Sequence, residues 1–174
     1  MALIEFIGHL LQQVDEETQA SLEGMTLAQI LWRPAEESNP MAWLAWHIAR
    51  TQDLRSSHLL GREQIWNEDG WHERFGLPAD PANTGRGHSD ADVSALQPES
   101  VEAVAMYCAL ASRRAREYVG SLSPGAENDV IDNPEGGQTP LGAVLSRMVH
   151  GGLTHVGQLM YVRGLIERRH WFSR

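Results

Sequence analysis

Hydrophobic residues recur at three- and four-residue steps in four stretches of the chain, which is the spacing of one face of an α-helix. The stretches cover residues 2–22, 40–60, 99–119 and 139–163. The last one carries an apolar stripe that continues just beyond it and is made of Leu141, Val144, Leu145, Met148, Gly152, His155, Leu159, Val162 and Ile166. The pattern predicts four long helices that each bury one face. No run alternates with the two-residue period of a strand for long enough to build a sheet.

Start signals mark two of these helices. Pro40 follows Ser38 and Asn39, either of which can cap a helix, and Pro140 follows Thr139 in the same way. Proline suits the first helical position because the residue there needs no partner for an amide hydrogen. We therefore expect helices to begin at Pro40 and at Pro140.

Residues 62–98 lack helical periodicity but carry Trp66, Trp71 and Phe75. A connection of this length is often a functional loop, and its aromatic residues favour packing against the rest of the chain. We expect residues 62–98 to form a long crossover between the second and third helices, a lid over a substrate, or both. The sequence thus predicts an all-α fold, a four-helix bundle with a long crossover between helices 2 and 3, in a single domain over residues 1–174.

Composition disfavours several classes of function. The chain has 23 acidic residues against 14 Lys and Arg, a net charge of −9 and a pI of about 5.3, so no nucleic-acid partner is expected. Cys108 is the only cysteine, so there is no disulfide framework. No apolar run approaches the roughly 18 residues of a membrane span, and the start lacks the features of a signal peptide. The expected location is the cytoplasm, without a membrane partner.

Two histidines lie on the inward faces of the second and fourth predicted helices. His47 shares a face with Trp43 and Thr51, and His155 lies within the apolar stripe of the last helix. A buried imidazole needs a partner, because burying a polar group without one costs on the order of a few kcal/mol. That partner is either a metal ion or a hydrogen-bonding group such as a carbonyl or carboxylate.

His150 is the third candidate metal ligand. It stands five residues before His155, and in an ideal helix this spacing turns the two side chains roughly 140° apart. Gly151 and Gly152 lie between them, and a π-turn at this glycine pair would bring positions i and i+5 onto one face. A site made of His47, His150 and His155 therefore depends on an irregular helix.

Longer segments resemble a known family. They are NPMAWLAWHIARTQD on the second predicted helix, HVGQLMYVRGL on the fourth, LWRP before the second helix and GREQIWNEDGWHERFGL after it. Together they are similar to the DinB-like family of bacterial helical bundles, which is related to thiol-dependent maleylpyruvate isomerases and thiol S-transferases. The resemblance covers nearly the whole chain. It implies a four-helix bundle that forms homodimers.

The resemblance also implies a divalent metal held by one histidine on the second helix and by two residues, usually four apart, on the fourth. His47 matches the first ligand and His155 the last. The middle ligand falls at Gly151, which has no side chain to coordinate a metal, and His150 is its only neighbouring substitute.

Two functions are consistent with these residues. The first is a metal-dependent enzyme resembling the thiol S-transferases and isomerases, in which bound Ni²⁺ or Zn²⁺ activates a small thiol to attack an electrophile. Asp53 or Gln158 would then orient a metal-bound imidazole. The second is a metal-free bundle that acts as a stress-associated or small-molecule binding protein, with His47 and His155 hydrogen-bonded to each other or to water. The absence of a metal-binding side chain at Gly151 favours the second function.

Overall fold

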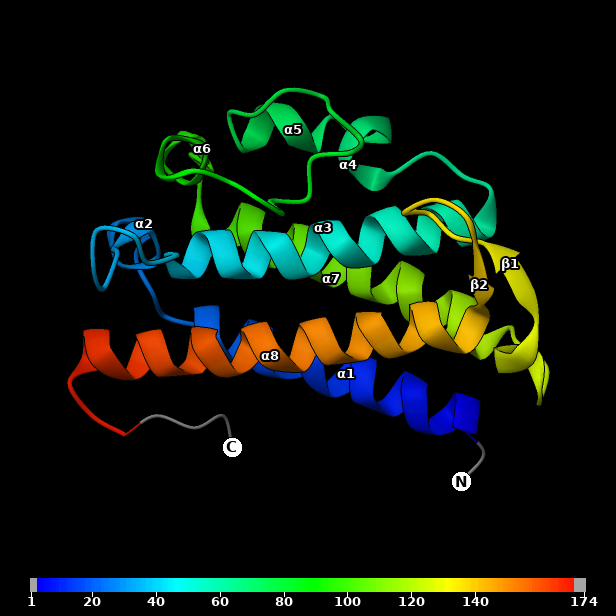
Figure 1. Cartoon of the computed structure of the whole chain (residues 1–174). Coiled ribbons are helices and arrows are strands. Elements are labelled where there is room, and N and C mark those ends of the chain that lie inside the picture. The colour runs from blue at the N-terminus through cyan, green and yellow to red at the C-terminus, as the bar shows by residue number, and fades with distance from the viewer. Residues whose placement is uncertain (1–2, 171–174) are drawn as a thin grey trace.

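Four long helices form the body of the computed structural model, which describes residues 3–170 (Figure 1). They are α1 (Leu3–Leu22), α3 (Met41–Leu60), α7 (Val101–Gly120) and α8 (Leu141–Glu167). Helix α3 packs against α7 and α8, and α1 packs against the same two helices. The prediction of an all-α chain is confirmed, since most of the described residues are helical. Within that range no helix is long and apolar enough to cross a membrane.

Short elements connect the long helices. Helix α2 (Leu27–Leu31) precedes α3, and α4 (Ile65–Glu68), α5 (Trp71–Arg74) and α6 (Asp90–Ala95) lie between α3 and α7. The 3₁₀-helix η1 (Ala126–Asn128) and the antiparallel strands β1 (Val130–Asp132) and β2 (Gln138–Pro140) precede α8. The sequence pattern did not reveal α4, α5 and α6, because helices of four to six residues are too short to show a helical period.

Both prolines that were expected at a first helical position stand one residue earlier, at the N-cap. Pro40 and Pro140 have extended ψ angles of 163° and 138°, and the helices begin at Met41 and Leu141. Pro140 pairs with Val130 across the hairpin, so its backbone belongs to β2. The hairpin therefore leads into α8 without a linker.

The apolar stripe predicted for the last helix is buried in α8, except at His155 and Ile166, which are half-buried. Gly152 lies where α8 approaches α1, because a Cβ added there would be only 3.0 Å from Cγ1 of Val14. This glycine therefore permits close packing of the two helices. The pair Gly151 and Gly152 does not interrupt the helix, since α8 is α-helical from its first to its last residue.

Residues 62–98 lie along α3 and α7 and carry the three short helices α4, α5 and α6 (Figure 1). Trp66, Trp71 and Phe75 are buried, and their ring centroids lie 5.5, 5.5 and 5.6 Å from that of Tyr107 on α7. This aromatic cluster attaches the long connection to the helices. It also fixes where the following residues, 80–88, lie relative to α3.

Candidate functional site

His47 of α3 and His155 of α8 lie next to each other between the two helices. Their ring centroids are 4.7 Å apart, and the ring planes are nearly perpendicular, at 88°. Both side chains are half-buried. The fold thus brings together two candidate ligands that come from distant parts of the sequence.

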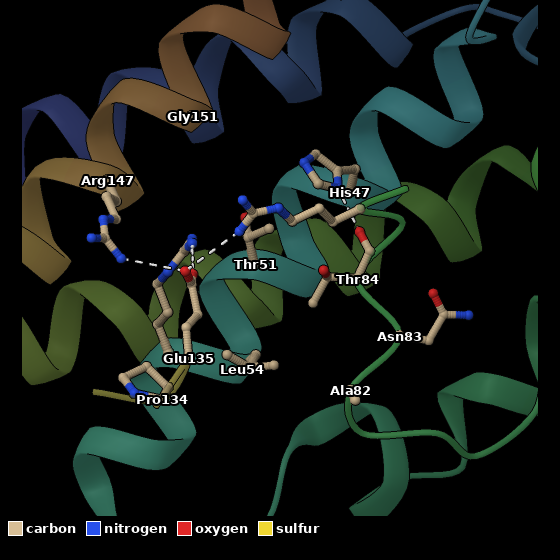
Figure 2. Close-up of a pocket in the computed structure, with 12 residues that line it drawn as sticks. His47, Thr51, Leu54, Ala82, Asn83, Thr84, Pro134, Glu135, Arg147 and Gly151 are labelled. Carbon is tan, nitrogen blue, oxygen red and sulfur yellow. Dashed lines mark hydrogen bonds and ion pairs between the residues drawn. The ribbon is translucent and has the colours of Figure 1, made fainter. Parts of the chain in front are cut away.

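One nitrogen of each ring is engaged by a carbonyl oxygen. Nδ1 of His47 donates a hydrogen bond to the backbone carbonyl of Thr84 (Figure 2), and Nδ1 of His155 donates to Oε1 of Gln158 at 2.8 Å. Because these oxygens only accept, each ring carries a proton on Nδ1. In the neutral tautomer that carries the proton on Nδ1, Nε2 keeps its lone pair, which is the form in which imidazole binds a metal.

Trp43 covers one face of His47. The indole and imidazole rings are stacked, with centroids 4.9 Å apart and planes 8° from parallel. Burial lowers the pKa of His47 from 6.5 to about 4, because the charged ring would lose solvation, although the hydrogen bond to Thr84 opposes the shift. His47 is therefore neutral at neutral pH.

We expect the free energy of unfolding of the metal-free protein to fall as the pH is lowered from 6.5 toward about 4. The pKa of His47 is about 4 in the folded chain and near 6.5 in the unfolded chain, so within this window the unfolded state binds the proton first. The stabilisation is fully present above pH 6.5 and its loss amounts to on the order of 2–3 kcal/mol. Urea unfolding at several pH values measures this loss.

The control for this pH dependence is a histidine at the surface. His47→Gln should flatten the profile in this window more than His58→Gln does, which replaces an exposed histidine near the end of α3 whose Nε2 lies 3.0 Å from the backbone carbonyl of Asp132. Identical profiles for the wild-type protein and His47→Gln would show that His47 is not the group responsible.

His150 lies on another face of α8. It is exposed, and it lines a groove with Phe6 and Leu10 of α1, away from the cavity that His47 lines. The π-turn that would rotate it toward His155 does not occur, since α8 is α-helical throughout. The structure therefore does not bring the third expected ligand to the other two.

Asp53, one of the two expected orienting partners, also lies away from the histidines. Its carboxylate is fully buried and accepts hydrogen bonds from the backbone N–H groups of Ile65 and Trp66, both at 2.9 Å. A residue six positions after His47 falls on a different face of the helix. Asp53 therefore anchors the start of α4, and only the other expected partner, Gln158, bonds to a candidate ligand.

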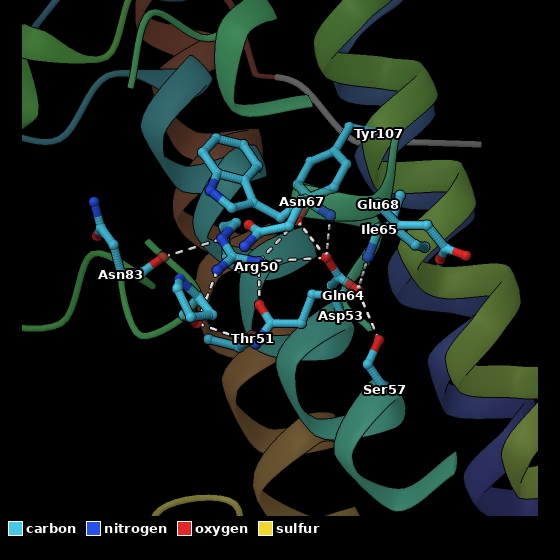
Figure 3. A network of polar contacts seen from close by, with 12 residues as sticks. Arg50, Thr51, Asp53, Ser57, Gln64, Ile65, Asn67, Glu68, Asn83 and Tyr107 are labelled. Atoms are coloured by element: carbon cyan, nitrogen blue, oxygen red, sulfur yellow. Dashed lines mark hydrogen bonds and ion pairs between the residues drawn. The ribbon is translucent and has the colours of Figure 1, made fainter. Parts of the chain in front are cut away.

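Asp53 is part of a buried polar network that holds the loop at residues 80–84 (Figure 3). The fully buried Arg50 donates to Asp53 at 3.3 Å, and it also donates to the backbone carbonyls of Asn83 at 3.0 Å and Pro81 at 3.1 Å. These bonds fix the backbone just before Thr84. The network thereby positions the carbonyl that accepts the hydrogen bond from the α3 histidine.

Gly85 lets this loop lie flat on the tryptophans of α3. Its φ angle is +90°, and a Cβ there would lie 2.7 Å from a ring carbon of Trp43 and 2.8 Å from one of Trp46. His88 follows, and its Nδ1 accepts a hydrogen bond from Nε1 of Trp43 at 3.1 Å.

Sequence reasoning did not identify Thr84 or His88 as site residues. The available signal was NTGRGHSD, a polar, glycine-containing stretch within an aromatic-rich segment.

A cavity of about 610 Å³ lies beside His47 (Figure 2). Its walls come from α3, α8, the loop at residues 82–86 and the turn between β1 and β2. Gly151 forms part of the α8 wall, one helical turn before His155. A cavity of this size suits a small-molecule ligand.

The donor atoms fit two of the three protein ligands of a divalent metal site. Imidazole nitrogen is a preferred ligand of Zn²⁺ and Ni²⁺, and His47 and His155 each present one. Among residues 3–170, no group of three or more His, Cys, Asp or Glu side chains could hold a metal ion. Gly151 occupies the expected middle position, and a Cβ added there would meet nothing within 4 Å. Space beside Gly151 and His47 is therefore open to ligands from outside the protein.

Comparisons with known proteins agree with this fold. The crystal structure of a conserved protein from Enterococcus faecalis superposes with a TM-score of 0.85 and 23% sequence identity, over 97% of this chain and 99% of that one. At this identity the likeness shows a shared fold only. No curated protein matches the chain. The family model of the DinB superfamily matches residues 10–159, and the chain therefore belongs to the DinB superfamily, as its sequence motifs predicted.

Proposed function

We propose that the chain is a divalent-metal-dependent enzyme that activates a small thiol, similar to bacterial thiol S-transferases and isomerases. The observation that carries the proposal is the pair of adjacent imidazoles, His47 and His155, whose Nδ1–H groups are committed to oxygen acceptors. Membership in the DinB superfamily, which includes metal-binding enzymes, supports it further.

A Zn²⁺ or Ni²⁺ ion bound by these two residues would lower the pKa of a coordinated thiol, so that the thiolate needed to attack an electrophile is present at neutral pH. Residues of the chain orient the two imidazoles and shield one of them from water. Thr84 and Gln158 fix the tautomers of the two rings, and Trp43 shields one face of His47 from water. The adjoining cavity gives the thiol and the electrophile room to meet.

Metal content tests this proposal. Protein purified without an affinity tag, loaded with excess Zn²⁺ or Ni²⁺ and desalted, should retain about one metal ion per chain. His47→Ala and His155→Ala should each lose most of it. His150→Ala is the matched control, because it removes an exposed histidine from α8, the helix that carries His155, at a position outside the cavity. This variant should retain the metal.

Wild-type protein that retains much less than one metal ion per chain would contradict the enzyme proposal. Unchanged metal content in both His47→Ala and His155→Ala would contradict the assignment of the ligands. Loss of metal in His150→Ala alone would move the site to the groove between α1 and α8.

A second candidate function is a metal-free, stress-associated or small-molecule binding protein. It is favoured by the missing third ligand in the described part of the chain and by the cavity beside His47. In this case His47→Ala and His155→Ala lower the free energy of unfolding by about 1–3 kcal/mol, through the loss of a half-buried hydrogen bond, and metal content plays no part.

We also propose that α1, α3, α7 and α8 form a four-helix bundle, with residues 62–98 as its long crossover, and that the chain acts as a homodimer. The contacts of α3 and α1 with both α7 and α8 support the bundle. Three exposed apolar side chains along α8, those of Leu153, Tyr161 and Leu165, support a surface for a second copy.

A further inference from the structure

Three arginines surround a single carboxylate in the wall of the cavity beside His47 (Figure 2). Arg55 of α3 donates to Oε1 of Glu135 at 2.5 Å. Arg147 of α8 donates to Oε2 at 3.3 Å, and Nη1 of Arg86, from the loop between α5 and α6, lies 3.7 Å from the same oxygen. Glu135 itself comes from the turn between β1 and β2. Four separate segments of the chain therefore meet at one carboxylate.

The charge of this cluster is not balanced. Three guanidinium groups face one carboxylate, which leaves an excess of two positive charges in a chain whose net charge is −9. Arg55 lies close enough to His47 to contribute to the lowering of its pKa. An excess of positive charge in the wall of a cavity attracts small anions. The anion-attracting part of the cavity is thus adjacent to the candidate metal ligand.

Stability alone does not account for Arg86 and Arg147 at this position. Exposed ion pairs contribute at most about 1 kcal/mol each, and the side chains of Arg86 and Arg147 are 85% and 51% exposed. All three arginines line the cavity. The planar guanidinium group matches the geometry of a carboxylate, so arginines are suited to recognise a ligand that carries one.

The hairpin that carries Glu135 buries little of its surface against the rest of the protein. Strands β1 and β2 have three residues each, and none of these residues is buried. The turn closes through Gly136 and Gly137, at φ angles of +99° and +74°. A segment with so little buried surface can move while the helices stay folded. Glu135 can therefore leave the arginines without disrupting the core.

We propose that the cavity binds a small molecule through a carboxylate of that molecule, which takes the place of the Glu135 carboxylate among Arg55, Arg86 and Arg147. Glu135 is the internal occupant that the ligand displaces. A carboxylate held there directs the rest of the molecule along the cavity toward His47. As a statement about the substrate of the enzyme, this inference depends on the proposed function, whereas the binding of the carboxylate requires no metal.

Calorimetric titration of chelator-treated protein with succinate, at low salt, tests the proposal. Succinamide, the uncharged diamide of the same carbon skeleton, is the control ligand. Glu135→Gln removes the competing carboxylate, and it should bind succinate at least about tenfold more tightly than the wild-type protein. Glu99→Gln is the matched control, since it removes a carboxylate from the exposed ion pair with Arg74, outside the cavity, and should bind like the wild-type protein.

The arginines are tested in the Glu135→Gln background. Adding Arg55→Gln or Arg147→Gln should weaken succinate binding at least about tenfold. Arg147 is half exposed, so its replacement leaves the fold intact, which circular dichroism and the urea midpoint verify. Two results overturn the proposal: succinate binding by Glu135→Gln no tighter than by Glu99→Gln, or equal affinity of Glu135→Gln for succinate and succinamide.

This test and the metal test fail independently. The titrations use chelator-treated protein, so a chain that binds no metal still gives a clear result for succinate. Conversely, Glu135→Gln should retain as much metal as the wild-type protein, because Glu135 is not one of the two proposed ligands.

Discussion

Gly151→His is expected to raise the affinity of the chain for Zn²⁺ or Ni²⁺ by at least about tenfold, because it supplies a third protein ligand. Loss of an outer hydrogen-bond partner of a ligand already changes metal affinity by about 10–100-fold, and a direct ligand should matter at least as much. Gly151 precedes His155 by four residues, so the two side chains share a face of α8. It lines the same cavity as His47, and a Cβ there meets nothing within 4 Å.

Gly157→His is the matched control for this change. It places the same side chain on the same helix, also where a Cβ meets nothing within 4 Å, but in a groove that does not include the candidate ligands. Tyr161 and Leu165, part of the surface proposed for a second copy, line that groove, so light scattering checks that both variants keep the same oligomeric state. Both variants replace a helical glycine, so both gain a similar helix stabilisation of about 0.5 kcal/mol. Competition with a chromogenic chelator compares the affinities. Equal and weak affinities of Gly151→His and Gly157→His for the ion would show that His47 and His155 are not oriented toward a common ion.

The same comparison separates the two candidate functions. Tight binding by both the wild-type protein and Gly151→His indicates that two histidines suffice and that external ligands complete the site, as the enzyme proposal requires. Tight binding by Gly151→His alone indicates that the chain keeps the scaffold of a metal site but not its metal. The binding-protein function is then favoured, and the arginines beside His47 become its main recognition element.

The long helices could be predicted from the sequence because each repeats its apolar period over several turns. The stripe on α8 is buried as expected, apart from its two half-buried positions, His155 and Ile166. The start of α8 was predicted one residue too early, because Pro140 pairs with Val130 in a hairpin whose three-residue strands leave no detectable pattern. Local signals thus located the helices but not the short elements between them.

The candidate site could be predicted only at positions where the helical period determines the direction in which a side chain points. The inward positions of His47 and His155 could be predicted because the helical period places each on a face that packs against other helices. The helical period indicates the face of α3 on which Asp53 lies. It does not reveal that two backbone N–H groups at the start of α4 donate hydrogen bonds to the Asp53 carboxylate. Thr84 and Glu135 act from irregular segments, whose positions depend on tertiary contacts with no sequence period. Those contacts include the buried network around Asp53, which holds the loop that reaches His47.

Asp53→Asn is expected to lower the free energy of unfolding by about 3–5 kcal/mol, as is typical when one partner of a buried ion pair is removed. Oδ2 of Asp53 faces donors on all sides: the Tyr107 hydroxyl and the Trp66 N–H at 2.9 Å, and Arg50 at 3.3 Å. Oδ1 accepts from the Ile65 N–H at 2.9 Å. An amide NH₂ in place of either oxygen would point a donor at donors, and it would leave the guanidinium of Arg50 buried without its counter-charge.

Asp90→Asn is the control for this prediction, because it makes the same chemical change in an exposed ion pair. The side chain of Asp90 is 56% exposed and bonds Arg33 at 2.6 Å, so its replacement should change the free energy of unfolding by no more than about 1 kcal/mol. Urea unfolding monitored by tryptophan fluorescence gives both values. Because Arg50 also holds the loop at residues 80–84, Asp53→Asn should alter the native-state fluorescence of Trp43 and Trp46, which that loop covers. Equal losses of stability in the two variants would contradict the role given to the Asp53 network.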